Sequence, residues 1–254
     1  MVEHSLATWG DEETSLAFEA SPRSVRVTFA GEVVADSKRA MLLHESGYPP
    51  VYYFPVEDVR MDLLEQTDHA TVCPYKGTAT YWTVAARGRR EKNAAWSYPE
   101  PVPGAPDLSG YIAFRWEAID EWLEEDDRLL GGARSPYHRV DAVWSERHVR
   151  VLLGGEVIAE TDRPCLVFET DAPTRYYLSP ADVRTELLAP SRTSTACPYK
   201  GVASYWTSTV GGQTVEDVAW SYESPPPEQP QIAGLLCFWP ERVDAIEVDG
   251  DPAG

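Results

Sequence analysis

The sequence predicts a mainly β protein made of two tandem copies of one small domain, with one connecting helix. The pentapeptide Cys-Pro-Tyr-Lys-Gly occupies residues 73–77 and returns unchanged at 197–201, an offset of 197 − 73 = 124 residues. The same offset aligns residues 25–114 with 149–238 without an insertion, which indicates a tandem duplication. Each copy alternates short apolar runs with turn signals, a pattern typical of a small β-barrel or sandwich.

Both copies open with a predicted β-hairpin. Residues 25–29 alternate apolar and polar side chains, Ala30-Gly31 permits a turn, and residues 32–35 return. The second copy has Gly154-Gly155 at the equivalent turn. Because glycine readily adopts the positive φ that tight hairpin turns need, the two copies support the same hairpin.

Further strands are predicted around one short helix. The helix is predicted to begin at residues 55–58, and its counterpart has Ser179 as N-cap and Pro180 at the first helical position. The strand-like runs of the first copy are residues 41–45, 51–54, 71–73, 78–84, 93–98 and 111–114.

The connection between the copies is predicted to contain an acidic helix over residues 117–130. Its apolar side chains fall on or near one helical face: Ile119, Trp122, Leu123 and Leu129. The predicted segments are an N-terminal arm (1–20), repeat one (21–116), the acidic helix and linker (117–144), repeat two (145–246) and a C-terminal tail (247–254).

Charge restricts the partners. The chain has 22 basic and 41 acidic residues, a formal net charge of −19 at pH 7. Nucleic acids and anionic membranes require a positive protein surface, so neither is expected as a partner. No apolar run approaches membrane-spanning length, the N-terminus does not resemble a signal peptide, and the four cysteines form no metal-binding pair or disulfide framework. We therefore expect a cytoplasmic protein with reduced thiols and with neither metal nor cofactor.

The repeated cysteines, Cys73 and Cys197, have two interpretations. As a thiolate nucleophile, Cys73 would be activated by the motif lysine and assisted by His69 as base. As small apolar residues, both cysteines would pack in the core before a tight turn. The other two thiols are not repeated and are expected to be structural: Cys165 and Cys237.

The motif lysines, Lys76 and Lys200, are candidates for an anion-binding cleft. A lysine in a turn flanked by tyrosine and glycine can point into a concavity as a positive point charge. The alternative is that each lysine forms an ion pair with an aspartate, Asp58 or Asp182. Two arginines that follow these aspartates either contribute to the cleft or hold the short helix by an internal salt bridge: Arg60 and Arg184.

Tyrosines and tryptophans retained in both copies are the other candidates for lining a cleft. Such side chains combine an apolar face with a hydrogen-bonding group; the alternative is that they pack in the core. The predicted ligand-binding residues are Tyr53, Arg60, Tyr75, Lys76, Trp82 and Trp96, with Tyr177, Arg184, Tyr199, Lys200, Trp206 and Trp220 in repeat two.

The order of these motifs resembles the DUF427 family. The resemblance covers nearly the whole chain and rests on Tyr-Tyr-x4-Asp-Val-Arg, the pentapeptide and Ala-Trp-Ser-Tyr, each present in sequence order. It implies a compact β-structure of tent or barrel type and a role that is uncharacterised. It also brings the label nucleotidyltransferase-like, an activity that requires carboxylates for metal and a phosphate-binding loop. The carboxylate pairs in the motif region have no such loop beside them: Asp58/Asp62 and Asp182/Glu186.

Three functions remain open at this point. The favoured one is binding of a small molecule, with an anion as one candidate, in clefts around the pentapeptide turns. The others are a protein-interaction module that uses exposed aromatic side chains, and a nucleotidyltransferase-like enzyme. Because His44 and His69 have no histidine counterparts, we expect any pH-dependent binding in repeat one. The oligomeric state stays open, since two repeats can mimic a dimer.

Overall fold

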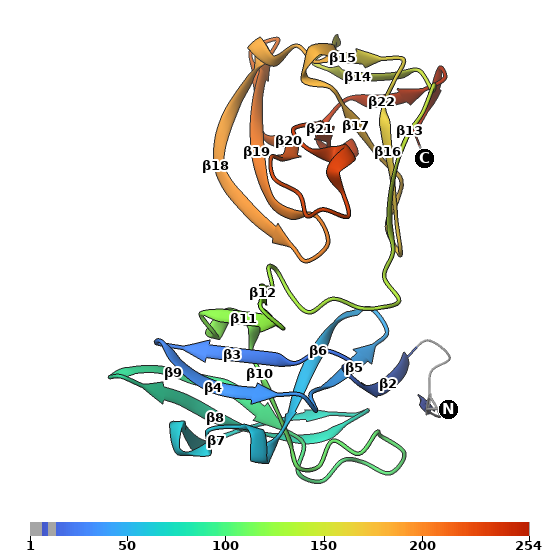
Figure 1. Cartoon of the computed structure of the whole chain (residues 1–254). Helices are drawn as coiled ribbons and strands as arrows, with labels where there is room; N and C mark the ends of the chain where they lie inside the picture. The colour runs from blue at the N-terminus through green and yellow to red at the C-terminus, as the bar shows by residue number, and fades with distance from the viewer. Residues whose placement is uncertain (1–6, 10–13, 254) are drawn as a thin grey trace. The chain divides into compact units, whose positions relative to one another are not determined.

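A computed structural model describes residues 7–9 and 14–253. The chain divides into two compact units, the first ending at Ser135 and the second beginning at Pro136. Figure 1 labels most of the strands of both units. Within the described residues, no helix is long and apolar enough to span a membrane.

Unit 1 contains one large and one small antiparallel sheet. Among the described residues, the large sheet has the strand order β1-β2-β5-β6-β10-β9-β8-β7, and the small sheet has the order β12-β11-β3-β4. The large sheet comprises β1 (Ala7–Trp9), β2 (Thr14–Ala20), β5 (Met41–Glu45), β6 (Tyr48–Pro55), β7 (Leu64–Cys73), β8 (Gly77–Ala86), β9 (Arg89–Ser97) and β10 (Tyr111–Phe114). The small sheet comprises β3 (Val25–Phe29), β4 (Glu32–Ser37), β11 (Glu121–Glu124) and β12 (Asp127–Arg128).

Unit 2 repeats this arrangement. Its large sheet has the order β13-β16-β17-β21-β20-β19-β18 and its small sheet the order β15-β14-β22-β23, so every strand except β1 has a counterpart. The large sheet comprises β13 (Val140–Trp144), β16 (Cys165–Glu169), β17 (Arg175–Leu178), β18 (Leu188–Cys197), β19 (Gly201–Val210), β20 (Gln213–Tyr222) and β21 (Leu236–Phe238). The small sheet comprises β14 (Val149–Leu153), β15 (Glu156–Thr161), β22 (Ala245–Val248) and β23 (Asp251–Pro252). The predicted mainly β, duplicated fold is confirmed.

The predicted short helix is a single 3-10 turn in both units. It spans Val56–Asp58 in unit 1 and Pro180–Asp182 in unit 2. In unit 2 the Ser179 hydroxyl accepts a hydrogen bond from the backbone N–H of Ala181 at 3.2 Å, so the predicted N-cap is present.

Each large sheet has apolar side chains on both faces. In unit 1, Phe54 belongs to the main core shared with the small sheet, while its neighbour Tyr53 belongs to a second cluster. Successive strand residues point to opposite faces, so this second cluster lies on the other face of the large sheet. Unit 2 has the same division, with Leu178 in the main core and Tyr177 in the second cluster. The pentapeptide turns pack against the second clusters, through Cys73 and Cys197.

The predicted helix over residues 117–130 is wrong. Apart from the 3-10 turn Trp116–Ala118, this segment forms β11 and β12. Trp122 of β11 lies opposite Val27 of β3 and is 4% exposed. An isolated β3–β4 hairpin would be marginally stable, and pairing with β11 extends it and buries the indole. Tertiary pairing therefore overrides an apolar spacing that also fits a helix.

Both repeats extend beyond the motifs that revealed them. In the predicted N-terminal arm, β2 pairs with β5 and places Ala17 opposite His44. In the predicted linker, β13 repeats this pairing with Asp141 opposite Phe168, at the same offset of 124. The predicted C-terminal tail contains β23 and the end of β22. The rest of the predicted arm, residues 1–6 and 10–13, lies outside the described residues.

Candidate functional site

The pentapeptide forms the tight turn between β7 and β8. Gly77 has a φ of 109°, and a Cβ atom there would lie 2.8 Å from the backbone oxygen of Glu100. Glycine tolerates both this backbone conformation and this close approach. Gly77 also forms a β-bridge with Pro101 in the proline-rich loop. The turn thus lies directly against that loop, and Lys76 within it is only 8% exposed.

Each motif lysine forms a salt bridge with a glutamate at the end of a strand in the large sheet. Lys76 pairs with Glu45 of β5, and Lys200 pairs with Glu169 of β16. The four side chains are between 10% and 17% exposed. Both pairs are neutral overall, and loss of one partner would leave a nearly buried charge without compensation.

These glutamates replace the aspartates considered from the sequence. Asp58 forms a salt bridge with Arg39 at 2.7 Å, and Asp182 accepts a hydrogen bond from Thr161 at 2.7 Å. The hydrogen bond from Arg39 holds the pKa of Asp58 below its usual range. The motif lysines do form ion pairs, as this interpretation predicted, but the predicted partners are wrong because neither aspartate pairs with a motif lysine.

A cleft of about 650 Å³ lies beside the salt bridge of unit 1. Three of the predicted ligand-binding residues line it: Tyr53, Lys76 and Trp96. Seven further aromatic side chains line it: Tyr48, Tyr52, Tyr81, Tyr98, Phe114, Trp116 and Trp122. This volume and this lining are typical of small-molecule sites, which combine apolar walls with a few polar groups.

Polar groups are placed at several points of the cleft wall. The indole Nε1–H of Trp96 donates a hydrogen bond to the hydroxyl of Tyr53 at 3.3 Å. Burial raises the pKa of Tyr53 well above its usual range, so the hydroxyl remains protonated. Asn93 and His69 also line the cleft, and the His69 ring lies 4.6 Å from the ring of Tyr81.

The other predicted residues of repeat one do not line this cleft. Arg60 forms an exposed salt bridge with Asp62 at 2.7 Å, and Trp82 packs against the main core. Tyr75 is partly exposed in the turn itself. In repeat two, Arg184 also forms an exposed salt bridge, with Glu156 at 2.7 Å. Neither arginine is bonded to the aspartate of its own Asp-Val-Arg motif.

All four cysteines are free thiols. Cys73 packs against the second cluster with Tyr53 and Tyr98, and it does not line the cleft. Burial raises the pKa of Cys165 to about 11 and that of Cys237 to about 12. These last two thiols therefore have the buried, unreactive environments expected of structural cysteines.

In repeat two, the corresponding tryptophan is covered by side chains of the same unit. The ring of Trp239 lies 4.4 Å from that of Trp220, with an interplanar angle of 43°. The guanidinium of Arg175 lies 5.2 Å from the centre of the Trp239 ring and 5.8 Å from that of Trp220. Trp220 is consequently 6% exposed, and its Nε1–H donates to the Tyr177 hydroxyl at 3.0 Å.

A histidine also lies beside the motif of repeat two, contrary to expectation. The His138 ring stacks on Tyr199 with centroids 4.2 Å apart, and its Nε2 lies 3.1 Å from a carboxylate oxygen of Glu169. His138 precedes the block that the repeated motifs align, and its counterpart at the 124-residue offset is Thr14. Titratable histidine beside the motif is therefore not confined to repeat one.

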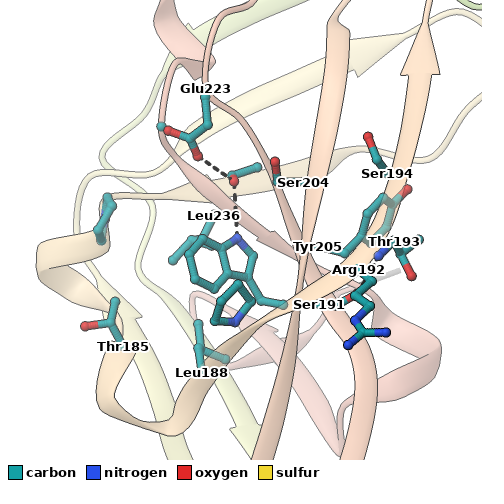
Figure 2. A pocket seen from close by; sticks show the side chains of 15 residues that line it. Thr185, Leu188, Ser191, Arg192, Thr193, Ser194, Ser204, Tyr205, Glu223 and Leu236 are labelled. Carbon is teal, nitrogen blue, oxygen red and sulfur yellow. Dashed lines mark hydrogen bonds between the residues drawn. The ribbon is translucent and has the colours of Figure 1, made fainter.

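Repeat two has a cavity of about 650 Å³ at a different place (Figure 2). Its lining includes Trp206, Ser221 and Glu223 and excludes the motif lysine. The Trp206 Nε1–H donates to the Ser221 hydroxyl at 3.2 Å, and that hydroxyl donates to Glu223 at 2.8 Å. Figure 2 shows Glu223 and Arg192 at opposite ends of this cavity. Of the predicted ligand-binding residues of repeat two, Trp206 is the one that lines it.

Sequence reasoning missed several residues of the unit 1 cleft. Glu45 carried a detectable signal, because an acidic residue recurs at the 124-residue offset as Glu169. Trp122 was assigned to a helix and so was not considered as a cleft residue. Arg115 and Trp116 had no signal, since their counterparts in repeat two are Trp239 and a proline.

Taken together, the chain is a tandem β-domain protein with a ligand-sized cleft beside a buried lysine–glutamate pair. Residues 17–125 and 141–249 each match the family described as a domain of unknown function, DUF427. The chain belongs to this family and contains two copies of its domain. No curated protein matches the chain significantly.

Proposed function

We propose that repeat one binds a small molecule in the cleft beside the Lys76–Glu45 salt bridge. The observation that carries this proposal is the convergence of Tyr53, Lys76 and Trp96 on one cleft of about 650 Å³. Tyr53 lies on β6 and Trp96 on β9 of the large sheet, whereas Lys76 lies in the pentapeptide turn. An interaction surface would instead spread these aromatic side chains over a flat patch.

The salt bridge favours a ligand whose polar group is not an anion. Glu45 already compensates the charge of Lys76, so an anion would have to compete with a carboxylate that is 17% exposed. The pair instead presents ammonium hydrogens as donors and carboxylate oxygens as acceptors. A neutral polar group, such as an amide or a hydroxyl, can bond to both partners, and a cationic group can donate to the carboxylate, in each case without displacing either partner. The proposal is confined to binding and assigns no catalytic role to Cys73.

The test is a fragment screen by ligand-detected NMR, with neutral, anionic and cationic fragments, on the parent protein and two double variants. Lys76→Met with Glu45→Gln removes both charges of the salt bridge beside the cleft, and Lys200→Met with Glu169→Gln removes both charges of the corresponding salt bridge in repeat two. Removal of both partners avoids the uncompensated charge that a single change would leave.

We expect neutral polar and cationic fragments to bind the parent, to lose at least half of their signal in the repeat-one double variant, and to retain it in the repeat-two double variant. Binding restricted to anions would show that Glu45 is displaced. Absence of any fragment binding, or loss only in the repeat-two variant, would refute the cleft as the binding site.

A further inference from the structure

Trp239 and Arg175 lie against Trp220 in repeat two, whereas the corresponding Trp96 lines a cleft in repeat one. We propose that Trp239 and Arg175 act there as an internal stand-in for the ligand of repeat one. The ligand class is then a planar aromatic compound that carries a cationic group beside its ring. This inference rests on the proposed function and specifies the ligand of the same cleft.

The backbone of the two sites is equivalent. The N–H of Arg115 donates to the carbonyl of Ala94 at 2.7 Å, and that of Trp239 donates to the carbonyl of Val218 at 3.0 Å, at the 124-residue offset. The second pair of equivalent positions lies on β6 and β17. Val51 lies opposite Leu43 in unit 1, and Arg175 lies opposite Val167 in unit 2. Two of the side-chain exchanges between the sites lie on this equivalent backbone: Arg115 for Trp239 and Val51 for Arg175.

A third exchange explains why Arg115 does not cover Trp96. The guanidinium of Arg115 pairs with Glu91 at 2.6 Å and is 46% exposed. The counterpart of Glu91 is Val215, which packs against the main core of unit 2. In repeat one the arginine is thus held by a neighbouring strand, and Trp96 stays partly exposed in the cleft wall.

The geometry in repeat two indicates what the open site accommodates. The Trp239 ring lies 4.4 Å from the Trp220 ring. The Arg175 guanidinium lies 5.2 Å from the centre of the Trp239 ring and 5.8 Å from that of the Trp220 ring. A cation near an aromatic face is favourable, particularly when it is partly desolvated. Val51 provides no such cation in repeat one, so the ligand would supply both ring and charge. The net charge of −19 also attracts cationic ligands.

The probes are four small molecules tested by isothermal titration calorimetry. Tryptamine supplies ring and ammonium, indole the ring alone, indole-3-acetate a ring with an anion, and cyclohexylethylamine an ammonium without an aromatic ring. We expect tryptamine to bind about tenfold more tightly than indole or cyclohexylethylamine, with indole-3-acetate weakest. Equal binding of the aromatic and saturated amines would overturn the inference while leaving the proposed function intact.

Exchanging the side chains between repeats provides the matched variants. Val51→Arg with Arg115→Trp should fill the cleft of repeat one and abolish tryptamine binding, with the thermal midpoint checked to show that the unit remains folded. Arg175→Val, Val215→Glu and Trp239→Arg should open repeat two and raise the stoichiometry from one to two. A gain of a site cannot result from misfolding. An unchanged stoichiometry in the opened variant, together with unchanged binding in the filled variant, would contradict the inference.

Discussion

The two repeats share a fold and a buried salt bridge, but they treat the tryptophan beside that salt bridge differently. Trp96 of repeat one lies partly exposed in a cleft wall, whereas Trp220 of repeat two is 6% exposed beneath Trp239. Apart from β1, the strand order is the same in both, and the backbone hydrogen bonds of Arg115 and Trp239 are equivalent. The two sites therefore differ in the side chains around an equivalent backbone position.

The largest expected effect distinguishes the two tryptophans. Trp220→Ala should lower the free energy of unfolding of unit 2 by about 4 kcal/mol, because it removes a buried indole and leaves a cavity. Trp96→Ala should cost unit 1 about 2 kcal/mol, since part of that indole is already exposed. Urea denaturation monitored by circular dichroism measures both. Equal losses would contradict the description of Trp220 as covered and Trp96 as open.

The motif lysines provide the next comparison. Lys76→Ala should destabilise unit 1 by about 3 kcal/mol, because Glu45 is left nearly buried without its cation. Lys200→Ala should cost less, because Glu169 keeps its hydrogen bond with His138 at 3.1 Å. The measurement is again urea denaturation of each variant.

A second substitution serves as the control for Lys76→Ala. Adding Glu45→Gln should recover part of the lost stability, since it removes the uncompensated charge. If Glu45→Gln instead deepens the loss, the salt bridge is not the reason for the effect.

A smaller effect is expected at the cavity of repeat two. Ser221→Ala leaves the Trp206 Nε1–H without its acceptor and should cost about 1 kcal/mol. The matched control is Ser97→Ala, because Ser97 has a single hydroxyl contact, with Thr80 at 3.3 Å. Thermal unfolding of both variants should show a larger shift for Ser221→Ala. The reverse order would argue against a contribution from the Trp206–Ser221 hydrogen bond.

The smallest expected effect is a pH dependence in repeat two. Burial alone would raise the pKa of Glu169, but the hydrogen bonds and charges of Lys200 and His138 outweigh it and lower the pKa. A carboxyl whose folded pKa is depressed stabilises the fold above its unfolded pKa, about 4.3, and loses this contribution as the pH falls through the folded pKa. Glu169→Gln should therefore flatten the loss of thermal stability below about pH 4.3.

Local patterns were sufficient to predict the duplication, the hairpins and the Ser179 cap. The hairpins and the cap depend on residues close together in sequence, such as the paired glycines at the turn before residue 156, and the duplication is evident from motifs repeated at a fixed offset. The strand containing Trp122 was misassigned because its partner, Val27, lies about a hundred residues earlier. Periodicity within a short segment does not reveal such a partner.

The candidate site was predictable to a similar degree. Repetition identified Tyr53, Lys76 and Trp96, which the fold brings together. Repetition also selected Arg60 and Trp82, but Arg60 forms a surface salt bridge and Trp82 packs against the main core. Conversely, a search for repeated motifs does not detect the exchange of Arg115 for Trp239, because this exchange is a difference between the copies.

The most direct test is the NMR response of the tryptophan indole N–H resonances to tryptamine. Trp96 and Trp220 are assigned from the signals lost in Trp96→Phe and Trp220→Phe. We expect the Trp96 resonance to shift with ligand concentration and the Trp220 resonance to stay in place, because one indole faces an open cleft and the other is covered by Trp239. A shift of Trp220 without a shift of Trp96 would contradict the assignment of the open site to repeat one.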